Sequence, residues 1–482
     1  MNKIYKSIVI PGIIKQMNRQ RALQLLTDIK EAIAGTEQDF TSGSMRRAIF
    51  LLAVPMVLEM LMESTFAVFD IYFVTKLGPD AIATVGLTES LITIVYAIGV
   101  GLSMSTTALV SRRIGEKDPE KAARAAFQSI ITGLAVSLLI AIPGMIFAKD
   151  LMRMMGANDT IVNEMSSYTS IMLGGNAVIM MLFIINAVFR SSGDAAISFR
   201  VLVIANLLNI ILDPLLIFGI GPFPELGITG AAIATNTGRG LAVLYQLYLL
   251  FYGKGRVRLS AKNIAIRMET IRQVLKLSAG GIGQYLIATS SWIGLYRIIS
   301  EFGSEALAGY TIAIRIVIFA LMPAWGISNA ASTLVGQNLG AGKPDRAEKS
   351  VWVVSRINMF YMGLVSILLV LLPGMFIGIF AEDTGFAESG VVALRTVSYG
   401  LIFYGLGMVV VQSFNGAGDT ITPTKINFVI FWLIEIPLAY ILAMMTGMGE
   451  QGVYYSIIIA ESLMTLAAVY YFRKGKWKLK QV

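Results

Sequence analysis

The feature that most constrains this chain is an internal repeat, because residues 47 to 240 recur 225 positions later with few gaps. Equivalent positions carry the same residue in pairs such as Gly78 and Gly303, or Pro119 and Pro344. Each copy of the repeat is long enough for several helices, and is therefore much longer than the short repeat unit of a solenoid protein. The repeat therefore predicts two similar folded lobes.

Composition indicates the environment of these lobes. Of the 482 residues, 56% are hydrophobic and only 14% are charged, which is far more apolar than an ordinary soluble domain. A helix needs about 20 apolar residues to cross a bilayer. We therefore expect an all-α integral membrane protein with about 12 transmembrane helices, arranged as two six-helix lobes related by a parallel repeat. The predicted spans are 48–72, 82–107, 125–147, 165–189, 198–220, 230–252, 274–298, 307–332, 350–372, 391–414, 424–446 and 453–472.

Basic residues predict the orientation, because Lys and Arg favour the cytoplasmic side of short loops. They cluster in the first 47 residues, in the 111–124 loop, in the 253–276 linker and after Arg473. We therefore expect a multi-pass protein of the inner (cytoplasmic) membrane with both termini cytoplasmic and the pseudo-twofold axis along the membrane normal. These inner loops explain the net charge of +9 and suit anionic lipid, so no nucleic-acid partner is needed.

The same patterns predict five regions. Residues 1–44 form a cytoplasmic extension rather than a cleaved signal peptide. Residues 45–252 form the N-terminal six-helix lobe, 253–273 a cytoplasmic linker, 274–472 the C-terminal six-helix lobe, and 473–482 a basic cytoplasmic tail. Since both lobes lie in one chain, we expect a monomer.

Two residue types are absent, and this narrows the chemistry. The chain has no cysteine and no histidine, which excludes thiol chemistry and imidazole relays, and it lacks a Gly-rich phosphate loop of the Walker type. We expect no cofactor and no enzymatic activity, and transport energy must then come from an ion gradient. Proton exchange near neutral pH requires carboxylates whose pKa is raised by burial.

The first predicted span carries three acids on one helical face. Glu59, Glu63 and Asp70 lie within about 40° of one another at 100° per residue. Charged groups are costly in lipid and usually mark an ion or substrate path. Asp70 is the main candidate for cation coupling, while Glu59 and Glu63 are secondary candidates that alternatively line a wet vestibule. Pro55 lies on the same span and is a candidate hinge.

A second polar cluster occupies the fifth span. Asn206, Asn209 and Asp213 share a face within about 60°, and Pro214 follows directly as a second candidate hinge. Carboxylate, amide and freed carbonyl oxygens suit a proton or a hard cation such as Na⁺, so Na⁺ binding at Asp70, Asn209 and Asp213 is an open alternative. The competing interpretation is an interhelical polar clamp. Asn206 is a secondary candidate.

The repeat also allows each polar position to be compared with its own copy. Four of them are apolar in the second half: Asp70 pairs with Leu295, Asn186 with Val411, Asn209 with Ile434, and Asp213 with Leu438. We therefore expect the N-terminal lobe to hold the ion site and buried polarity to be confined to that lobe.

Several motifs together resemble the multidrug and toxic compound extrusion (MATE) family over about residues 45 to 472. They are Pro55 with the Phe69-Asp70-Ile71-Tyr72-Phe73-Val74 run, the twin loops ending at Gly115 and Gly340, the twin Phe-x-x-x-Gly-Asp loops at 189–194 and 414–419, and Asn209-x-x-Leu212-Asp213-Pro214. The resemblance implies a secondary antiporter that exports lipophilic, often cationic, drugs or toxic compounds in exchange for H⁺ or Na⁺ by alternating access.

The chain is most similar to the DinF-like branch of this family. That branch implies a coupling site of Asp70, Asn209 and Asp213 with Tyr168 and Asn186, and Thr235 is a secondary candidate for a missing hydroxyl. The NorM-like alternative expects acids on the seventh and tenth spans, and none occurs within 274–298 or 391–414. Alternative hypotheses for the function are a lipid-linked oligosaccharide flippase, an intramembrane enzyme and a non-transporting scaffold. A flippase would need several cationic side chains within the N-terminal spans.

Overall fold

The computed structural model describes residues 27–35, 39–381 and 385–482. Most of the predicted N-terminal extension, residues 1–26, lies outside this range. Residues 27–34 of the extension are helical. Every secondary-structure element in the described residues is a helix, as the apolar runs predict.

The N-terminal lobe follows the predicted spans closely. Its helices are α2 (Met45–Val74), α3 (Pro79–Gly115), α4 (Pro119–Ile146), α5 (Ala148–Met154), α6 (Ser166–Gly174), α7 (Asn176–Ser192), α8 (Ala195–Ile217) and α9 (Gly227–Tyr252). A π-helical segment, η2 (Ile161–Met165), leads into α6, and η2, α6 and α7 together form one span of 32 residues. The short helix α5 connects the third and fourth spans.

The C-terminal lobe repeats this order of helices. Its elements are α10 (Met268–Ile299), α11 (Ser304–Gly340), α12 (Pro344–Leu371), α13 (Pro373–Ala381), α14 (Ala387–Ser398), α15 (Leu401–Ala417), α16 (Ile421–Asn427), η5 (Phe428–Glu435), α17 (Ile436–Tyr440), η6 (Ile441–Met445) and α18 (Glu450–Arg473). Here η5 and η6 are π-helical, and 421–445 is one continuous span. The short helix α13 is the counterpart of α5.

The described residues contain nine helices that are long and apolar enough to span a membrane, and the bent pair α14 and α15 makes a tenth. Helices α9 and α10, of 26 and 32 residues, are more polar but long enough to cross. Together they give the predicted twelve spans. The two six-helix lobes predicted from the repeat are confirmed.

Each lobe has a hydrophobic core of its own, and two clusters also cross between the lobes. One hydrophobic cluster lies mainly in the N-terminal lobe, from Val74 to Leu259, and includes Val274 of α10, and another lies within the C-terminal lobe, from Leu295 to Tyr454. A third cluster joins the first half of α2, Ala48 to Met56, to residues of the C-terminal lobe that include Leu334 and Phe472. The first half of α2 is therefore buried against the opposite lobe.

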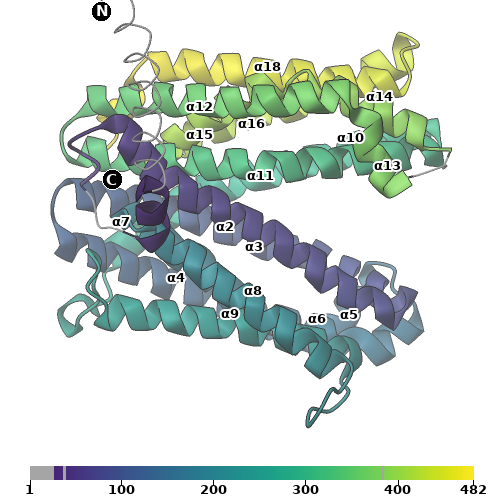
Figure 1. Ribbon diagram of the computed structural model, residues 1–482, viewed down its shortest axis with the longest axis horizontal. Coiled ribbons are helices and arrows are strands. Elements are labelled where there is room, and N and C mark those ends of the chain that lie inside the picture. Colours follow the sequence, from purple (N-terminus) through teal and green to yellow (C-terminus); the bar gives the residue numbers. More distant parts are fainter. Residues whose placement is uncertain (1–26, 36–38, 382–384) are drawn as a thin grey trace, which may run out of the picture.

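The two lobes meet at the end of the molecule where the C-terminus lies, and α2 and α11 diverge toward the other end (Figure 1). At the closed end, Gly115 of α3 lies directly against the carbonyl of Gln337, and Gly340 of α11 lies against the carbonyl of Arg112. Gln337 Nε2 donates to the carbonyl of Ser191 at 2.8 Å. Among the described residues, hydrogen bonds between the lobes extend no further than Ser64, two thirds of the way along α2, and Met322, midway along α11.

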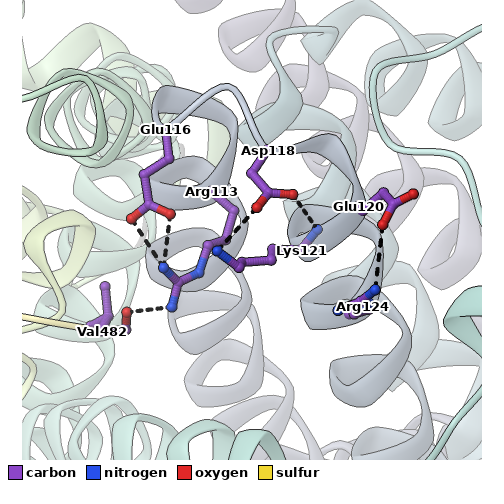
Figure 2. A network of polar contacts seen from close by, with 7 residues as sticks. All are labelled: Arg113, Glu116, Asp118, Glu120, Lys121, Arg124 and Val482. Atoms are coloured by element: carbon purple, nitrogen blue, oxygen red, sulfur yellow. Dashed lines mark hydrogen bonds and ion pairs between the residues drawn. The ribbon is translucent and has the colours of Figure 1, made fainter.

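Figure 2 shows the polar side chains that surround this closed end. Arg113 donates to both carboxylate oxygens of Glu116, at 3.0 and 2.8 Å, and to the carbonyl of Val482 at 2.7 Å. Asp118 caps α4 by accepting from the backbone N–H of Lys121 at 2.9 Å, and this bond lowers the pKa of Asp118. The tail of the chain therefore links both lobes at this end.

The close approach at Gly115 generates a prediction. A methyl group there overlaps the Gln337 carbonyl, so Gly115→Ala should force the closed ends of α3 and α11 apart. Because the chain has no cysteine, spin labels can be placed at Glu120 and Asp345, which are exposed at the starts of α4 and α12. Double electron–electron resonance spectroscopy should report a longer distance between the two spin labels in the variant than in the parent.

Gly86→Ala is the matched control, because Gly86 lies in the same helix with nothing within 4 Å of an added methyl group. It should leave the distance distribution as in the parent. An unchanged distribution in Gly115→Ala would show that this contact does not hold the closed end together.

Candidate functional site

Three helices of the N-terminal lobe bring four predicted side chains into one hydrogen-bonded chain. Thr235 Oγ1 on α9 donates to Asp70 Oδ1 on α2 at 3.4 Å. Asn209 Nδ2 on α8 donates to Thr235 Oγ1 and to Asp213 Oδ1, each at 3.2 Å. The order Asp70, Thr235, Asn209, Asp213 is a continuous polar path between two carboxylates.

Close packing of α8 on α9 positions this path. At Gly238, one turn from Thr235, an added methyl group would lie 3.0 Å from the carbonyl of Ala205 and 3.3 Å from the backbone nitrogen of Asn209. The absent side chain allows the two helix backbones to approach at this level, as small residues do at membrane helix interfaces. Thr235 therefore reaches Asn209 directly.

The site has unsatisfied capacity for a cation. Asn209 and Asp213 are fully buried, and Asn209 Oδ1 and Asp213 Oδ2 have no hydrogen-bond partner. Buried polar atoms without a partner are rare and costly, and both of these are acceptors. The described residues contain no group of three or more His, Cys, Asp or Glu suited to a metal ion. A bound H⁺, or Na⁺ with amide and hydroxyl ligands, fits the two acids.

The structure places the two candidates of the fourth predicted span, Tyr168 and Asn186, in different surroundings. Tyr168 on α6 is buried in the core of the N-terminal lobe and lies within electrostatic range of both Asp70 and Asp213. Asn186 on α7 instead donates from Nδ2 to Glu59 Oε1 at 3.1 Å and accepts from Gln246 Nε2 at 2.5 Å. Asn186 thus belongs to a different cluster from the Asp70 path.

That second cluster is built around Glu59. Arg190 Nη1 donates to Glu59 Oε1 at 2.6 Å, and the Glu59 side chain is 3% exposed. Arg190 and Gln246 were not predicted from the sequence, although Arg190 is the second residue of the Phe-x-x-x-Gly-Asp motif that begins at Phe189. Glu59 is therefore the acid of a buried ion pair.

The remaining secondary candidates bond within the same lobe. Arg239 Nη2 donates to Glu63 Oε1 at 3.2 Å, and the Arg239 guanidinium stacks 4.4 Å above the Phe66 ring. Asn206 Nδ2 donates to the carbonyl of Met62 at 2.7 Å, which ties α8 to α2. Asn206 thus makes the interhelical clamp that was the alternative interpretation for its cluster.

The two candidate hinge prolines lie inside helices that contribute to the site. Pro55 is within α2, and the next residue, Met56, presents its carbonyl 2.7 Å from where a methyl group at Gly326 of α11 would lie. Pro214 is in the last turn of α8, directly after Asp213. Both prolines interrupt helical hydrogen bonding close to a site acid or to the contact between lobes.

Buried acids are not confined to the N-terminal lobe, so that expectation is wrong. Glu435 at the end of η5 is 3% exposed, and Glu435 and Glu461 each have a buried carboxylate oxygen with no partner. The copies of Asn209 and Thr235 in the second half are residues 434 and 460. Glu435 and Glu461 each follow one of these positions by one residue, so a comparison of equivalent positions does not find them. Apolar copies at the N-lobe site positions do not exclude acids elsewhere on the same helices.

Two six-helix lobes of membrane-spanning helices, each with buried acids in its interior, are typical of a membrane transporter. The family model MatE matches residues 55–215 and 282–441, once in each lobe, so the chain belongs to the MatE family of transporters.

Curated relatives cover nearly the whole chain. The probable multidrug resistance protein YoeA of Bacillus subtilis is 24% identical over 453 residues, which is 92% of this chain and 97% of the relative. The FAD transporter of Shewanella oneidensis is 24% identical over 431 residues, which is 89% of this chain and 94% of the relative.

A solved structure is also similar. It is the outward-facing conformation of a multidrug resistance MATE family transporter of the MOP superfamily, with a TM-score of 0.85 and 25% identity, covering 91% of this chain and 98% of that one.

The Glu59 pair generates a stability prediction. Arg190→Gln leaves a buried carboxylate without its cation, so the free energy of unfolding should fall by about 3 to 5 kcal/mol. The double variant Glu59→Gln with Arg190→Gln should recover most of this loss. Denaturant unfolding of the purified protein in mixed micelles measures both changes.

Arg153→Gln is the matched control, because the Arg153 and Asp150 pair is about half exposed and should contribute less than about 1 kcal/mol. If Arg190→Gln were as stable as Arg153→Gln, the Glu59 pair would not be a structural element of the lobe.

Proposed function

We propose that this chain is a secondary antiporter that exports lipophilic, often cationic, compounds in exchange for H⁺, with Na⁺ as the alternative coupling ion. The observation that supports this most strongly is the path from Asp70 through Thr235 and Asn209 to Asp213. It connects two carboxylates across three helices and leaves acceptor atoms free for a cation. Membership of a transporter family and the multidrug relative support the substrate class.

The coupling mechanism follows from the cost of two charges in one buried site. Two close carboxylates resist joint ionisation, so the site binds a proton when it is open to the proton-rich side. A proton on Asp213 Oδ2 also replaces an unpaired acceptor with a donor. Losing the proton to the other side restores the charge, and the hydrogen bonds of Thr235 and Asn209 then rearrange.

The driving force is adequate for such exchange. One charge moved across about 100 mV contributes about 2.3 kcal/mol, and a gradient of one pH unit adds about 1.4 kcal/mol. Together these support a gradient of about several hundred-fold for an uncharged compound, whereas one-for-one exchange against a monovalent cation moves no net charge and is driven by the pH gradient alone, about tenfold per pH unit. No nucleotide hydrolysis is required.

The arrangement of the lobes fits an outward-facing state. With both termini cytoplasmic, the closed end with Gly115 and Gly340 faces the cytoplasm and the lobes diverge toward the outside (Figure 1). We propose that proton binding at Asp70 bends α2 at Pro55, releases the contact with Gly326 of α11 and exchanges access. The chain works as a monomer in the cytoplasmic membrane, because both lobes are in one polypeptide.

The position of the acids supports the DinF-like branch. Asp70 and Asp213 lie on the first and fifth spans, and no acid occurs within 274–298 or 391–414 of the seventh and tenth. The flippase alternative is less supported, because Arg190 and Arg239 of the N-terminal lobe are each paired with a glutamate rather than free to bind pyrophosphate. We propose that the Tyr168 side chain lines the site formed by Asp70 and Asp213. Asn186 belongs instead to the cluster around Glu59.

The central prediction concerns Asp70. Asp70→Asn removes the carboxylate but keeps its shape, so gradient-driven efflux of a fluorescent lipophilic cation from proteoliposomes should fall to the level of protein-free vesicles. An imposed pH gradient and then a Na⁺ gradient identify the coupling ion. Asp150→Asn, the same change at an exposed residue of the same lobe, is the control and should transport normally.

Normal efflux by Asp70→Asn under either gradient would refute coupling through this residue. Absence of transport in the parent protein under both gradients would instead favour lipid translocation.

The bridging hydroxyl gives a finer prediction. Thr235→Val is nearly isosteric but cannot connect Asp70 to Asn209, so we expect at least a roughly tenfold loss of exchange rate, equivalent to about 1.4 kcal/mol. Thr235→Ser keeps the hydroxyl and should retain most of the rate. Equal rates for Val and Ser variants would show that the connection through Thr235 does not contribute to exchange.

A further inference from the structure

The C-terminal lobe encloses a small cavity of about 50 Å³ between α10, α11, α15, the η5 span and α18. Aliphatic and aromatic side chains form most of its wall, with Trp292, Tyr310 and Tyr404 as the aromatic members. Glu435 and Glu461 are the two acids that line it. The cavity is far smaller than the roughly 300 to 1,000 Å³ of sites for drug-sized ligands.

The two acids in this cavity lack a cationic partner. Glu435 is 3% exposed, and the Oε2 atoms of Glu435 and Glu461 are buried without a hydrogen bond. Ser291 of α10 is a hydrogen-bonding neighbour of Glu435, and Glu435 and Glu461 interact with each other electrostatically. The other titratable groups that face them are Tyr310 and Tyr404, and no Lys or Arg lines the cavity in the described part of the chain.

Unpaired acids in such surroundings favour binding of a cation. Two unpaired carboxylates within a membrane-spanning lobe are strongly unfavourable, and neither has a basic residue to neutralise it. Apart from the carboxylates, Ser291 and tyrosine hydroxyls, the surroundings offer few oxygen atoms, whereas hard metal cations take several oxygen ligands. A proton needs no such ligand set, because it converts a carboxylate into a neutral carboxyl group.

The position within the repeat also indicates a site. Glu435 and Glu461 are the copies of Ile210 and Asn236, which directly follow Asn209 and Thr235 of the N-terminal site. The fifth and sixth spans of each lobe therefore carry buried polar groups at nearly the same level. Glu435 is also the last residue of a π-helical segment, and such segments occur frequently at functional sites.

We propose that Glu435 and Glu461 form a second proton-binding site, located in the C-terminal lobe and independent of the Asp70 path. The proton is bound at their buried, unpartnered carboxylate oxygens. The transporter then has one exchangeable proton site in each lobe.

Infrared spectroscopy tests this proposal without measuring transport, so its outcome is separate from that of the antiport proposal. The parent is the full-length Asp70→Asn, Asp213→Asn protein in micelles at neutral pH, in which the acids of the N-terminal path are amides. It should show a carbonyl stretching band from a protonated carboxylic acid that shifts in deuterated water. Adding Glu435→Gln and Glu461→Gln should remove that band.

A second pair of substitutions guards against misfolding of the glutamine variant. Glu435→Ile with Glu461→Asn introduces the residues found at the equivalent N-lobe positions and should also remove the band. Persistence of the band in both double variants, or its absence from the parent, would overturn the proposal. Loss of the parent's band when Na⁺ replaces K⁺ would also overturn it, because the pair would then bind Na⁺ in place of a proton.

Discussion

The arrangement depends on a helix shared between two cores. The first half of α2, Ala48 to Met56, is buried with Leu334 and Phe472 of the C-terminal lobe, whereas Asp70 in its second half bonds to Thr235 of the N-terminal lobe. Pro55 lies near the junction. A change at Asp70 therefore acts on an element that is anchored in the opposite lobe, which is a direct mechanical route between a buried charge and the relation of the lobes.

The site itself depends on backbone packing more than on the acids alone. Asn209 and Asp213 are one turn apart on α8 and would meet in any helix. Thr235 reaches them only because Gly238 lets α9 approach the backbone of α8 near Ala205. Asp70 is then connected through a neutral hydroxyl, and in the described part of the chain it accepts no hydrogen bond from a basic residue, although Arg239 lies within electrostatic range of it. By contrast, Glu59 and Glu63, on the same face of α2, have arginine partners.

Much of the fold could be predicted from the sequence because apolar length and the repeat register are one-dimensional signals. The twelve spans begin and end within several residues of the predicted positions. Helical spacing also placed Asp70, Asn209 and Asp213 on the right faces. Helical spacing could not predict how each helix is rotated about its own axis relative to its neighbours. That rotation brings Asn186 to Glu59 and Asn206 to the Met62 carbonyl.

Glu435 and Glu461 lie within predicted spans, so their burial could be expected from the sequence, but their lack of a basic partner could not. The comparison of copies assumed that a lost site leaves an apolar lobe, but an acid one residue further along a helix is rotated by about 100° and can face another part of the interior. Patterns along one chain do not show which cavity such a residue lines. Only the packing of five spans around it reveals that the pair has no basic neighbour.

The reciprocal contacts at the closed end have a consequence for ancestry. Gly115 packs on the chain beside Gly340, and Gly340 packs on the chain beside Gly115, so the same surface is used twice. This is the geometry of an isologous dimer interface. A single six-helix ancestor could have closed this end by pairing with its own copy. Joining the two genes would make that pairing independent of concentration and would free each half to acquire different acids.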